Sequence, residues 1–254
     1  MKLKDSVIIV TGAGSGVGRS LAIEYAKKGA VVVCCGRRLE RLEETIALIK
    51  AEGGEGLAAA ADITIPGQVC EAVNTALDSF GRIDVLFNNA GSFRSIAGVA
   101  ESDPETWWDD VRVNLFGTYL MIREVLPHMM KRDSGIIINM DGGRPPGGSA
   151  YGASKAGVSE LSRILLKELA LLESSVMVFM AGPGLVRTEM TELQAESEAG
   201  RKWIPSTYEM IEKNLTRKPE EIAAVTARLI ELARPEWNGM SFGPDTDFDE
   251  LLKS

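Results

Sequence analysis

The sequence predicts an α/β protein with a doubly wound, mainly parallel sheet, folded as a single domain over residues 1–254. Short apolar runs alternate along the chain with longer segments of helical period, and the links between them are short. Alternation of this kind implies parallel strands joined by right-handed crossovers. A glycine-rich turn joins the first apolar run to the first helical segment, as in a strand–turn–helix unit. No repeat or linker divides the chain, and its length is ordinary for one such domain.

Each predicted strand reads as a continuous apolar run, as expected for strands buried on both faces of a parallel sheet. A short seventh strand is expected within Gly239–Gly243, and the acidic segment Asp245–Glu250 is expected to be an exposed tail. The six main strands are predicted at Val7–Val10, Val31–Cys35, Leu57–Ile63, Val85–Asn89, Ile136–Met140 and Val176–Met180.

Helices are predicted between these runs, and glycine or proline marks several of their ends. The segments Gly16–Lys28 and Gln68–Phe80 each stop at a glycine, which favours a helix C-terminus. Pro104 stands where the first turn of a helix accepts proline. Ala150–Leu172 has helical periodicity throughout. These positions place a helix between most neighbouring strands.

The polar segment Thr188–Thr216 breaks the alternation between the last long strand and the last helix. In open α/β sheets, ligands bind beyond the carboxyl ends of the strands. A long insertion directly after a strand is therefore expected to form a lid over the substrate. A peripheral helical pair without a functional role is the alternative.

Composition argues against several classes of protein. The net charge of −8 argues against a general nucleic-acid binder, which needs a basic face. No apolar run reaches the roughly 18 residues that suggest a membrane span, and the N-terminus lacks the features of a signal peptide. The single histidine argues against a His-based metal cluster or a Ser–His–Asp triad, so no metal is expected. Cys34 and Cys35 are adjacent within an apolar run, which favours buried thiols in a reducing cytoplasm.

The glycine-rich turn Thr11–Gly18 lies between the first predicted strand and the first predicted helix. Backbone N–H groups at such a helix N-terminus can hold a pyrophosphate, and glycine permits the tight turn and the close approach of the phosphate. The glycines follow the pattern TGxxxGxG and not GxGxxG. The residues of this turn expected to bind a dinucleotide are Gly12, Ser15, Gly16, Val17 and Gly18.

The end of the second predicted strand indicates which dinucleotide is preferred. An acidic residue that binds the ribose of NAD is expected about 20 residues after the glycine turn. Gly36 stands there instead, followed by Arg37 and Arg38. A guanidinium suits a 2′-phosphate, so we predict NADP(H) in preference to NAD(H). The alternative is that both arginines only begin a solvated helix.

Four further motifs follow the glycine turn along the chain. They are Asn88-Asn-Ala-Gly91, Asn114, Tyr151-x-x-x-Lys155 and Pro183-Gly-x-Val-x-Thr188. In this order the five motifs resemble those of the short-chain dehydrogenases/reductases, from about Val7 to about Gly243. The resemblance implies a Rossmann-type NADP-binding domain, a small-molecule carbonyl or alcohol substrate, and a homo-oligomer, either a tetramer or a dimer.

The resemblance also implies that the remaining cofactor contacts come from the ends of three strands. The third strand frames the adenine, the fourth lines the ribose, and the sixth holds the nicotinamide through the backbone of Val186 and the hydroxyl of Thr188. For Asn88–Gly91 the alternative is a plain turn that closes a strand. The residues implied are Asp62 and Ile63 for the adenine, Asn89, Ala90 and Gly91 for the ribose, and Pro183, Gly184, Val186 and Thr188 for the nicotinamide.

Tyr151 and Lys155 are four residues apart in a predicted helix and therefore lie on one face. A phenol with a pKa of about 10 is a poor base at neutral pH, but a nearby ammonium lowers that pKa. We therefore predict that Tyr151 is the general acid/base and that Lys155 lowers its pKa. By the resemblance, Lys155 also holds the nicotinamide ribose, and Asn114 helps hold a water that connects Lys155 to solvent. The alternatives are a helix surface pair and an asparagine bonded to its own backbone.

One departure from the family pattern bears on activity. The serine that normally ends the fifth strand and binds the substrate oxygen is absent, with Gly142 in its place and Asp141 before it. Removing one donor to a developing oxyanion typically costs about 10²–10³ in rate. Either a water or a donor from the lid replaces it, or turnover is weak. Ser149 is not expected to reach the same place.

The sequence therefore predicts an NADP-dependent oxidoreductase that interconverts a carbonyl and an alcohol by hydride transfer. The alternative is an NADP-binding protein with weak or lost catalysis, acting as a sensor or an assembly partner. The intact Tyr151, Lys155 and Asn114 favour the enzyme, and the missing serine favours the alternative.

Overall fold

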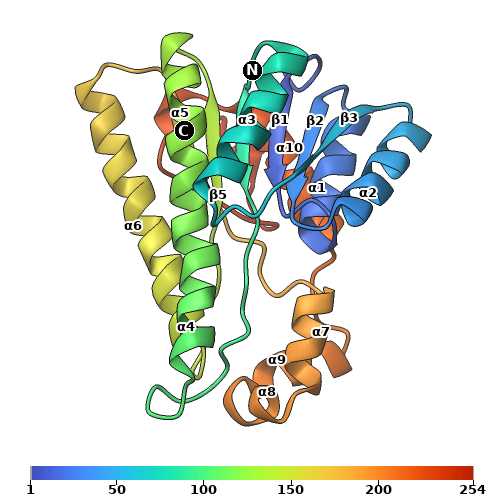
Figure 1. Cartoon of the computed structure of the whole chain (residues 1–254), viewed down its shortest axis with the longest axis vertical. Helices are drawn as coiled ribbons and strands as arrows, with labels where there is room; N and C mark the ends of the chain where they lie inside the picture. The colour runs from blue at the N-terminus through green and yellow to red at the C-terminus, as the bar shows by residue number, and fades with distance from the viewer. Residues whose placement is uncertain (1, 254) are drawn as a thin grey trace.

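A computed structural model describes residues 2–253, and its centre is a seven-stranded parallel sheet (Figure 1). The strand order is β3-β2-β1-β4-β5-β6-β7, and every neighbouring pair is parallel. The order reverses between β1 and β4, which confirms the predicted doubly wound α/β fold. The strands are β1 (Val7–Thr11), β2 (Val31–Gly36), β3 (Glu55–Ala60), β4 (Val85–Asn88), β5 (Ile136–Met140), β6 (Met177–Ala181) and β7 (Ser241–Phe242).

Helices cover both faces of this sheet. They are α1 (Gly16–Lys27), α2 (Leu39–Ala51), α3 (Pro66–Phe80), α4 (Pro104–Val111), α5 (Thr118–Lys131), α6 (Ser149–Leu171), α7 (Glu189–Glu196), α8 (Glu198–Trp203), α9 (Pro205–Glu212), α10 (Pro219–Leu232) and α11 (Phe248–Leu251). A π-helical turn, Arg112–Gly117, joins α4 to α5, and a 3-10 turn, Pro235–Trp237, follows α10. Across residues 2–253, no helix combines the length and apolarity needed to cross a lipid bilayer.

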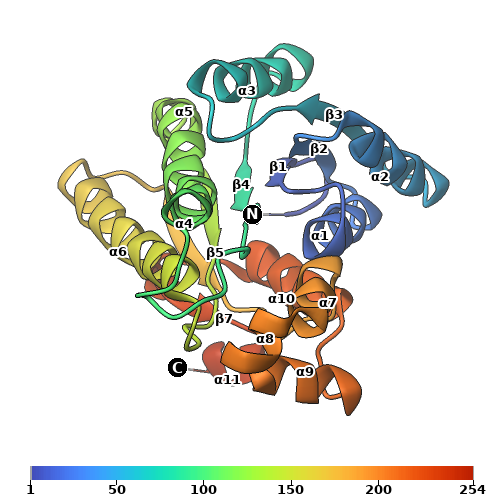
Figure 2. The ribbon, with the colours of Figure 1, turned by 60° about the horizontal axis from the view of Figure 1, so that its bottom comes forward.

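Two buried apolar layers hold the helices on the sheet. One lies between the sheet and α1, α2 and α10, and the other lies between the sheet and α3, α5 and α6 (Figure 2). Successive residues of β1 enter the two layers in turn: Ile8 and Val10 face the first, and Val7 and Ile9 face the second. Because both faces are covered, the strands need apolar residues at every position, which explains their continuous apolar runs.

A buried carboxylate joins the strands at their N-terminal edge. Asp84, directly before β4, has no exposed surface and accepts a hydrogen bond from the N–H of Val7 at 2.9 Å. Arg82 and Arg132 form ion pairs with it at 2.8 and 2.6 Å. Burial alone would raise the pKa of Asp84, but the bonds from Arg82, Val7 and Arg132 outweigh it and lower that pKa. This edge of the sheet is therefore held by a buried ionic cluster.

The third strand begins and ends earlier than predicted, at Glu55–Ala60 and not at Leu57–Ile63. Its register with β2 sets these bounds, because Gly36, the last residue of β2, pairs with Ala60. It is an edge strand and only partly buried, so its polar first residue carried no hydrophobic signal. Asp62 and Ile63 accordingly lie in the turn after the strand. The other five main strands agree with prediction to within one residue at each end.

The prediction of an exposed tail at Asp245–Glu250 is right for its acidic residues, which are exposed, and wrong for Phe248, which is buried at the start of a short helix. Asp247 caps α11 by accepting hydrogen bonds from two N–H groups of its first turn, at 2.9 and 3.1 Å. Phe248 is only 1% exposed and stacks on Phe242 of β7, with ring centroids 5.7 Å apart. One aromatic residue thus ties an otherwise acidic segment to the core.

The segment Thr188–Thr216 forms three short helices, α7, α8 and α9, which follow β6. Figures 1 and 2 show them as a small orange lobe beyond one edge of the sheet. Thr188 caps α7 together with Thr191. The lobe therefore lies on the side of the sheet where a doubly wound fold binds its ligands.

Candidate active site

The glycine turn closes tightly at the C-terminal edge of the sheet. Gly12 and Gly16 have φ angles of +69° and +51°, a region that favours glycine. A Cβ atom on Gly18 would collide with the carbonyl oxygen of Gly12, so the first turn of α1 lies directly on the end of β1. Val17 packs against the core, and the side chain of Ser15 makes no capping bond within residues 2–253. The first N–H groups of α1 therefore fit the phosphates of a dinucleotide.

Arg37 and Arg38, which follow β2, are exposed and free to bind a ligand. Neither Arg37 nor Arg38 forms an ion pair with another described residue. The nearby Arg41, by contrast, lies 3.2 Å from Glu44, which also pairs with Arg19 at 2.8 Å. The charge pattern of a solvated helix therefore includes Arg41 but leaves the two preceding arginines unpaired.

The two residues predicted to frame the adenine differ in their surroundings. The Oδ1 atom of Asp62 accepts hydrogen bonds from the N–H and the hydroxyl of Thr64, at 2.9 and 2.8 Å. Ile63 is buried, and a Cβ on Gly117 would lie 2.6 Å from its Cδ1. Asp62 thus shapes the turn after β3, and Ile63 packs on the π-helical turn. Their contact with an adenine stays a prediction.

Thr11 joins the ends of β1 and β4. Its hydroxyl oxygen accepts hydrogen bonds from the N–H groups of Asn89 and Ala90, both at 3.0 Å. The side chain of Asn89 donates to the carbonyl oxygen of Thr11 at 2.9 Å, and a Cβ on Gly12 would lie 2.9 Å from the Cα of Ala90. The Asn88–Gly91 segment therefore packs against the glycine turn and is more than a plain turn. Sequence reasoning missed Thr11 as a site residue, although its place directly before Gly12 was a signal.

Asn114 lies on the π-helical turn and is fully buried. Its Oδ1 accepts a hydrogen bond from the N–H of Ser92 at 2.7 Å. Its Nδ2 donates to the carbonyl oxygen of Ser92 at 2.8 Å and to the hydroxyl of Ser154 at 3.0 Å. A Cβ on Gly91 would lie 3.2 Å from its Oδ1. Asn114 therefore joins the loop after β4 to α6 instead of bonding to its own backbone, and its link to Lys155 through a water stays a prediction.

Tyr151 and Lys155 lie one turn apart on α6, near the end of β5. Lys155 is only 3% exposed, and its Nζ donates to the carbonyl oxygen of Met140 at 2.7 Å. The same Nζ lies 5.7 Å from the centre of the Tyr151 ring. The four-residue spacing thus brings both side chains to one face of the helix.

Burial dominates the electrostatics of both groups. Burial lowers the pKa of Lys155 to about 8, and the charge of Asp141 partly opposes this change. Burial, followed by the negative charge of Asp141, raises the pKa of Tyr151 to about 12 against a smaller effect of Arg144. This direction is opposite to the predicted lowering by Lys155, because burial has the largest effect on the pKa of Tyr151 and the Lys155 ammonium bonds to a backbone carbonyl instead of the phenol. The phenol is therefore protonated at neutral pH.

The hydroxyl of Tyr151 lies directly over Gly142. A Cβ on Gly142 would collide with this hydroxyl and would lie 2.7 Å from Cζ of the ring. The Oγ of Ser149 accepts a hydrogen bond from Nε1 of Trp107 at 3.0 Å, and the expectation that Ser149 does not replace the missing serine stays a prediction. The position of Tyr151 therefore requires glycine at 142.

The predictions from the sequence also did not include the aromatic neighbour of Tyr151. The ring of Phe93 stacks on that of Tyr151, with centroids 4.5 Å apart and planes 9° apart. Phe93 follows the Asn88–Gly91 motif, but no spacing rule connects it to a tyrosine on α6. The contact depends on the folded chain and left no local signal.

The motif Pro183–Thr188 reaches the glycine turn across the site. A Cβ on Gly16 would lie 3.2 Å from Cγ2 of Thr188. Gly184 has a φ angle of +69°, and Val186 forms a backbone bridge with Arg217. Segments from the start, middle and end of the sequence thus meet at one edge of the sheet. The placement of Val186 and Thr188 against a nicotinamide stays a prediction.

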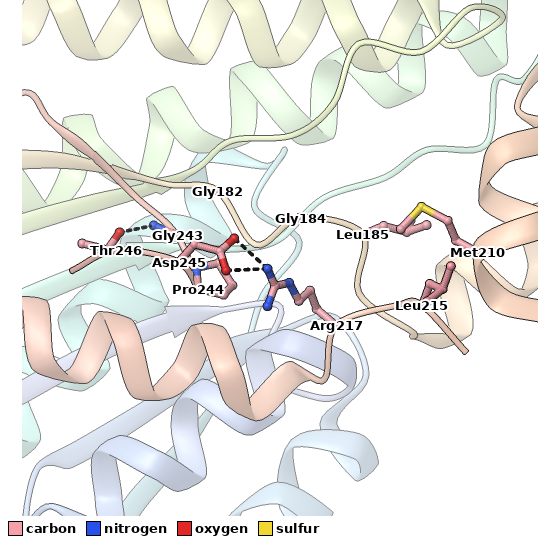
Figure 3. Close-up of a pocket in the computed structure, with 10 residues that line it drawn as sticks. All are labelled: Gly182, Gly184, Leu185, Met210, Leu215, Arg217, Gly243, Pro244, Asp245 and Thr246. Atoms are coloured by element: carbon pink, nitrogen blue, oxygen red, sulfur yellow. Dashed lines mark hydrogen bonds and ion pairs between the residues drawn. The ribbon is translucent and has the colours of Figure 1, made fainter. Parts of the chain in front are cut away.

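A cavity of about 440 Å³ lies beside this motif, between the loop after β6, the end of α9 and the segment after β7 (Figure 3). Arg217 donates to both carboxylate oxygens of Asp245 at 2.6 Å. Leu185, Met210 and Leu215 form the apolar part of the lining. Tyr151 is not among the residues that line this cavity.

The reversal of strand order, the glycine turn and the pairing of Tyr151 with the buried Lys155 define a class of protein: a doubly wound α/β fold with a dinucleotide-type turn. The model of the short chain dehydrogenase family matches residues 6–199. The chain belongs to this short-chain dehydrogenase family, whose members are oxidoreductases that bind a nicotinamide cofactor.

Relatives and solved structures resemble nearly the whole chain. A 3-oxoacyl-(acyl-carrier-protein) reductase of Thermotoga maritima is 33% identical over 230 residues, which cover 89% of this chain and 90% of the relative. An uncharacterised oxidoreductase of Listeria monocytogenes is 33% identical over 235 residues, which cover 91% and 92%. A variant of actinorhodin polyketide ketoreductase with NADPH has a TM-score of 0.84 at 27% identity, covering 96% of this chain and 97% of that one. Levodione reductase has a TM-score of 0.83 at 27% identity, covering 94% and 96%.

Proposed function

We propose that this chain is an NADP(H)-dependent oxidoreductase that interconverts a carbonyl and an alcohol, with Tyr151 as general acid/base. The observation that carries the proposal is the pairing of Tyr151 with the buried Lys155 on one face of α6, beside the end of β5. Burying an ionisable amine is costly, and such groups cluster at functional sites. The names of the related 3-oxoacyl reductase and ketoreductase support reduction of a ketone or a 3-oxoacyl compound.

A nicotinamide cofactor held at the glycine turn would supply the hydride. Tyr151 is protonated at neutral pH, because its pKa is about 12, and donates its proton to the substrate oxygen. Lys155 holds the end of β5 through Met140, and its positive charge, present below a pKa of about 8, stabilises the phenolate that remains. The reverse reaction needs the phenolate as base.

Replacement of Tyr151 tests the mechanism. In assays of NADPH oxidation with ketones and 3-oxoacyl thioesters, Tyr151→Phe is expected to lower kcat about 10²- to 10⁴-fold while NADPH binding is retained. Tyr119→Phe, an exposed tyrosine on α5, is the matched control and is expected to keep wild-type kcat. Unchanged kcat in Tyr151→Phe would contradict the mechanism. NADPH binding without turnover of any substrate would favour a sensor or an assembly partner.

The preference for NADP(H) is proposed from the unpaired Arg37 and Arg38 beside Gly36. A charge-assisted bond to a 2′-phosphate contributes about 1.5–3 kcal/mol. Arg37→Ala and Arg38→Ala are therefore each expected to raise the KM for NADPH about 10- to 100-fold and to leave the KM for NADH unchanged. Arg41→Ala, which removes an arginine already paired with Glu44, is the control. Comparable kcat/KM of the wild-type enzyme for both cofactors would contradict the preference.

We also propose that residues 1–254 form one NADP-binding domain and that Thr188–Thr216 is its substrate lid. The lobe contacts the loop after β4 through Lys202 and Glu101, which lie 3.3 Å apart. It also contacts that loop through a hydrogen bond from Gln194 to the carbonyl oxygen of Phe93. These contacts support a lid because Phe93, which Gln194 contacts, stacks on Tyr151.

A homo-oligomer, either a dimer or a tetramer, is proposed from exposed apolar side chains on one side of the molecule. Trp108, Phe116 and Tyr119 are exposed on α4, the following π-helical turn and α5. Apolar surface of this kind marks interaction sites. Sedimentation of the wild-type protein and of Phe116→Glu tests the proposal, and a monomeric wild-type protein would refute it.

A cytoplasmic location is proposed from the cysteines. Cys34 and Cys35 are free and buried, and burial raises the pKa of both thiols to about 12. Buried neutral thiols of this kind fit a reducing compartment. Cell fractionation tests the location.

A further inference from the structure

Packing holds Tyr151 in place between an aromatic ring and a glycine. Phe93 stacks on the Tyr151 ring at a centroid distance of 4.5 Å, and the Tyr151 hydroxyl lies against Gly142. Phe93 is itself confined, because a Cβ on Gly148 would lie 2.7 Å from its Cζ. Among residues 2–253, no group forms a hydrogen bond with the Tyr151 hydroxyl. The orientation of the phenol therefore depends on packing.

The segment that carries Phe93 is fixed on both flanks by Asp110. This carboxylate has no exposed surface. It accepts hydrogen bonds from the hydroxyl of Ser92 at 2.5 Å and from the N–H groups of Arg94 and Ser95, both at 2.9 Å. Moving the segment would leave a buried carboxyl group without its hydrogen-bond donors, which is unfavourable. The backbone of Phe93 therefore has little freedom.

Residues of the lobe complete the enclosure of Phe93. Gln194 of α7 is buried and donates from Nε2 to the carbonyl oxygen of Phe93 at 3.2 Å. Trp203 of α8 packs on two glycines: a Cβ on Gly147 would lie 2.7 Å from its Cγ, and one on Gly98 would lie 2.8 Å from its Cη2. A backbone hydrogen bond of 2.9 Å joins the two loops that carry these glycines. The lobe and both loops therefore pack together next to Phe93, which stacks on the phenol.

We infer that Phe93 is a positioning residue for Tyr151, and that the lobe holds Phe93 in position through Gln194 and Trp203. This inference rests on the proposed function, because it concerns the acid–base group of that reaction. Gly142 has no side chain with which to direct the phenol, so the stacked ring sets its orientation. Displacement of a reacting group by about 1 Å can cost 10²-fold in rate. Contacts that hold the phenol therefore act on kcat.

Stacking by Phe93 also contributes to the burial that raises the pKa of Tyr151. Loss of the ring would admit solvent to the phenol and lower that pKa toward its ordinary value. The charged groups around the phenol are Asp141 and Arg144 on the loop after β5 and Lys155 on α6. These charged groups are the same in the wild-type protein and in a variant at position 93. A change in the titration of Tyr151 therefore reports that the Phe93 ring no longer shields the phenol from solvent.

Phe93→Leu keeps an apolar side chain and removes the ring. It is expected to lower kcat for carbonyl reduction about 10- to 100-fold and to leave the KM for NADPH unchanged. Phe80→Leu is the matched control. Phe80 ends α3, near the N-terminal ends of the strands and away from Tyr151, so this variant is expected to keep the wild-type kcat. Wild-type kcat in Phe93→Leu would overturn the inference.

A measurement without turnover separates this inference from the proposed function. NMR of tyrosine labelled with carbon-13 at Cζ follows the titration of Tyr151, and Tyr151→Phe identifies its resonance. Phe93→Leu is expected to titrate at lower pH than the wild-type protein, and an unchanged titration overturns the inference. If the wild-type protein reduces no carbonyl compound, the proposed function fails, but the shift in titration still shows that Phe93 covers the phenol.

Gln194→Leu tests whether the lobe holds Phe93 in position. Loss of one hydrogen bond to the Phe93 carbonyl is expected to lower kcat about 2- to 10-fold and to move the Tyr151 titration in the same direction. Unchanged kcat together with an unchanged titration would overturn the connection between the lobe and the phenol.

Discussion

Gly142 has no side chain, and the hydroxyl of Tyr151 uses the space that one would need. The resemblance of the sequence to the family leads us to expect a serine here, so the glycine at first suggests a lost donor. The packing gives another explanation, because a larger residue would push the phenol out of its stack on Phe93. At the scale of residues, the glycine and the tyrosine are therefore a matched pair.

Restoring the serine is predicted to harm the protein. Gly142→Ser puts atoms where the Tyr151 hydroxyl lies, and overpacking of this kind typically costs about 1–3 kcal/mol. We expect a lower melting temperature and at least a roughly 10-fold lower kcat. Gly143→Ser is the control, since a Cβ there meets only Pro145, at 3.9 Å. A higher kcat in Gly142→Ser would show that Tyr151 can move aside for a useful donor.

The spacing of Tyr151 and Lys155 along one helix predicted that they share a face. Their pKa values were not predictable, because burial depends on the whole fold. Phe93 and Thr11 carry contacts between distant segments, and such contacts leave no pattern in a local window. Sequence motifs thus identified the reacting groups but not the residues that hold them.

At the scale of elements, local signals placed helix ends well. Pro104 occupies the first turn of α4, as predicted, and the structure adds the cap by Asp103, which accepts the N–H of Thr106 at 2.8 Å. Gly81, with a φ angle of +71°, ends α3. The first and last residues of β3 are set by its pairing with β2, so the apolar run in the sequence did not reveal them. Ends set by neighbouring residues were therefore predictable, and ends set by a partner strand were not.

The short helix α11 is predicted to contribute to stability through one side chain. Phe248 is almost fully buried against Phe242 and Trp237. Phe248→Ala is expected to lower the free energy of unfolding by about 3–5 kcal/mol in urea titrations. Leu252→Ala, just beyond the helix and partly exposed, is the control with an expected loss below about 1 kcal/mol. Equal losses in the two variants would mean that the segment packs loosely.

At the scale of the whole molecule, the alternation of apolar runs and helical segments was sufficient to predict the architecture. Right-handed crossovers leave few ways to arrange such a chain. The strand order itself, and the return of the C-terminal segment to the core through Phe248, came only from the structure. The periodicity of a sequence predicts its helices and strands and hence the layers of the fold. The order of the strands within the sheet depends on packing between distant segments.

The ionic cluster at Asp84 predicts how stability responds to acid. Its pKa is lowered in the folded protein, so its contribution is present above the ordinary pKa of about 3.8 and is lost as the pH falls through the folded value. Asp84→Asn is expected to lower the free energy of unfolding by about 2–3 kcal/mol at pH 7, because its arginine partners are partly exposed. The difference from the wild-type protein should narrow below about pH 4.

Urea titrations at pH 7 and pH 3 measure this difference. Asp78→Asn, an exposed carboxylate on α3, is the control with little expected effect at either pH. A difference for Asp84→Asn that stays constant with pH would show that the ion pairs do not stabilise the fold.

The Asp84 cluster and the Tyr151 site lie at opposite ends of the same strands. Mutations that remodel the loops after β4, β5 and β6 therefore act far from the anchor that fastens the sheet. Because the two sites are far apart, substrate preference can change during evolution without loss of the ion pairs that stabilise the sheet. For protein engineers, residues 205–216, none of which is buried, are the part of this molecule to diversify, and the arginine–aspartate ion pairs and the residues packed around Tyr151 are the parts to leave unchanged.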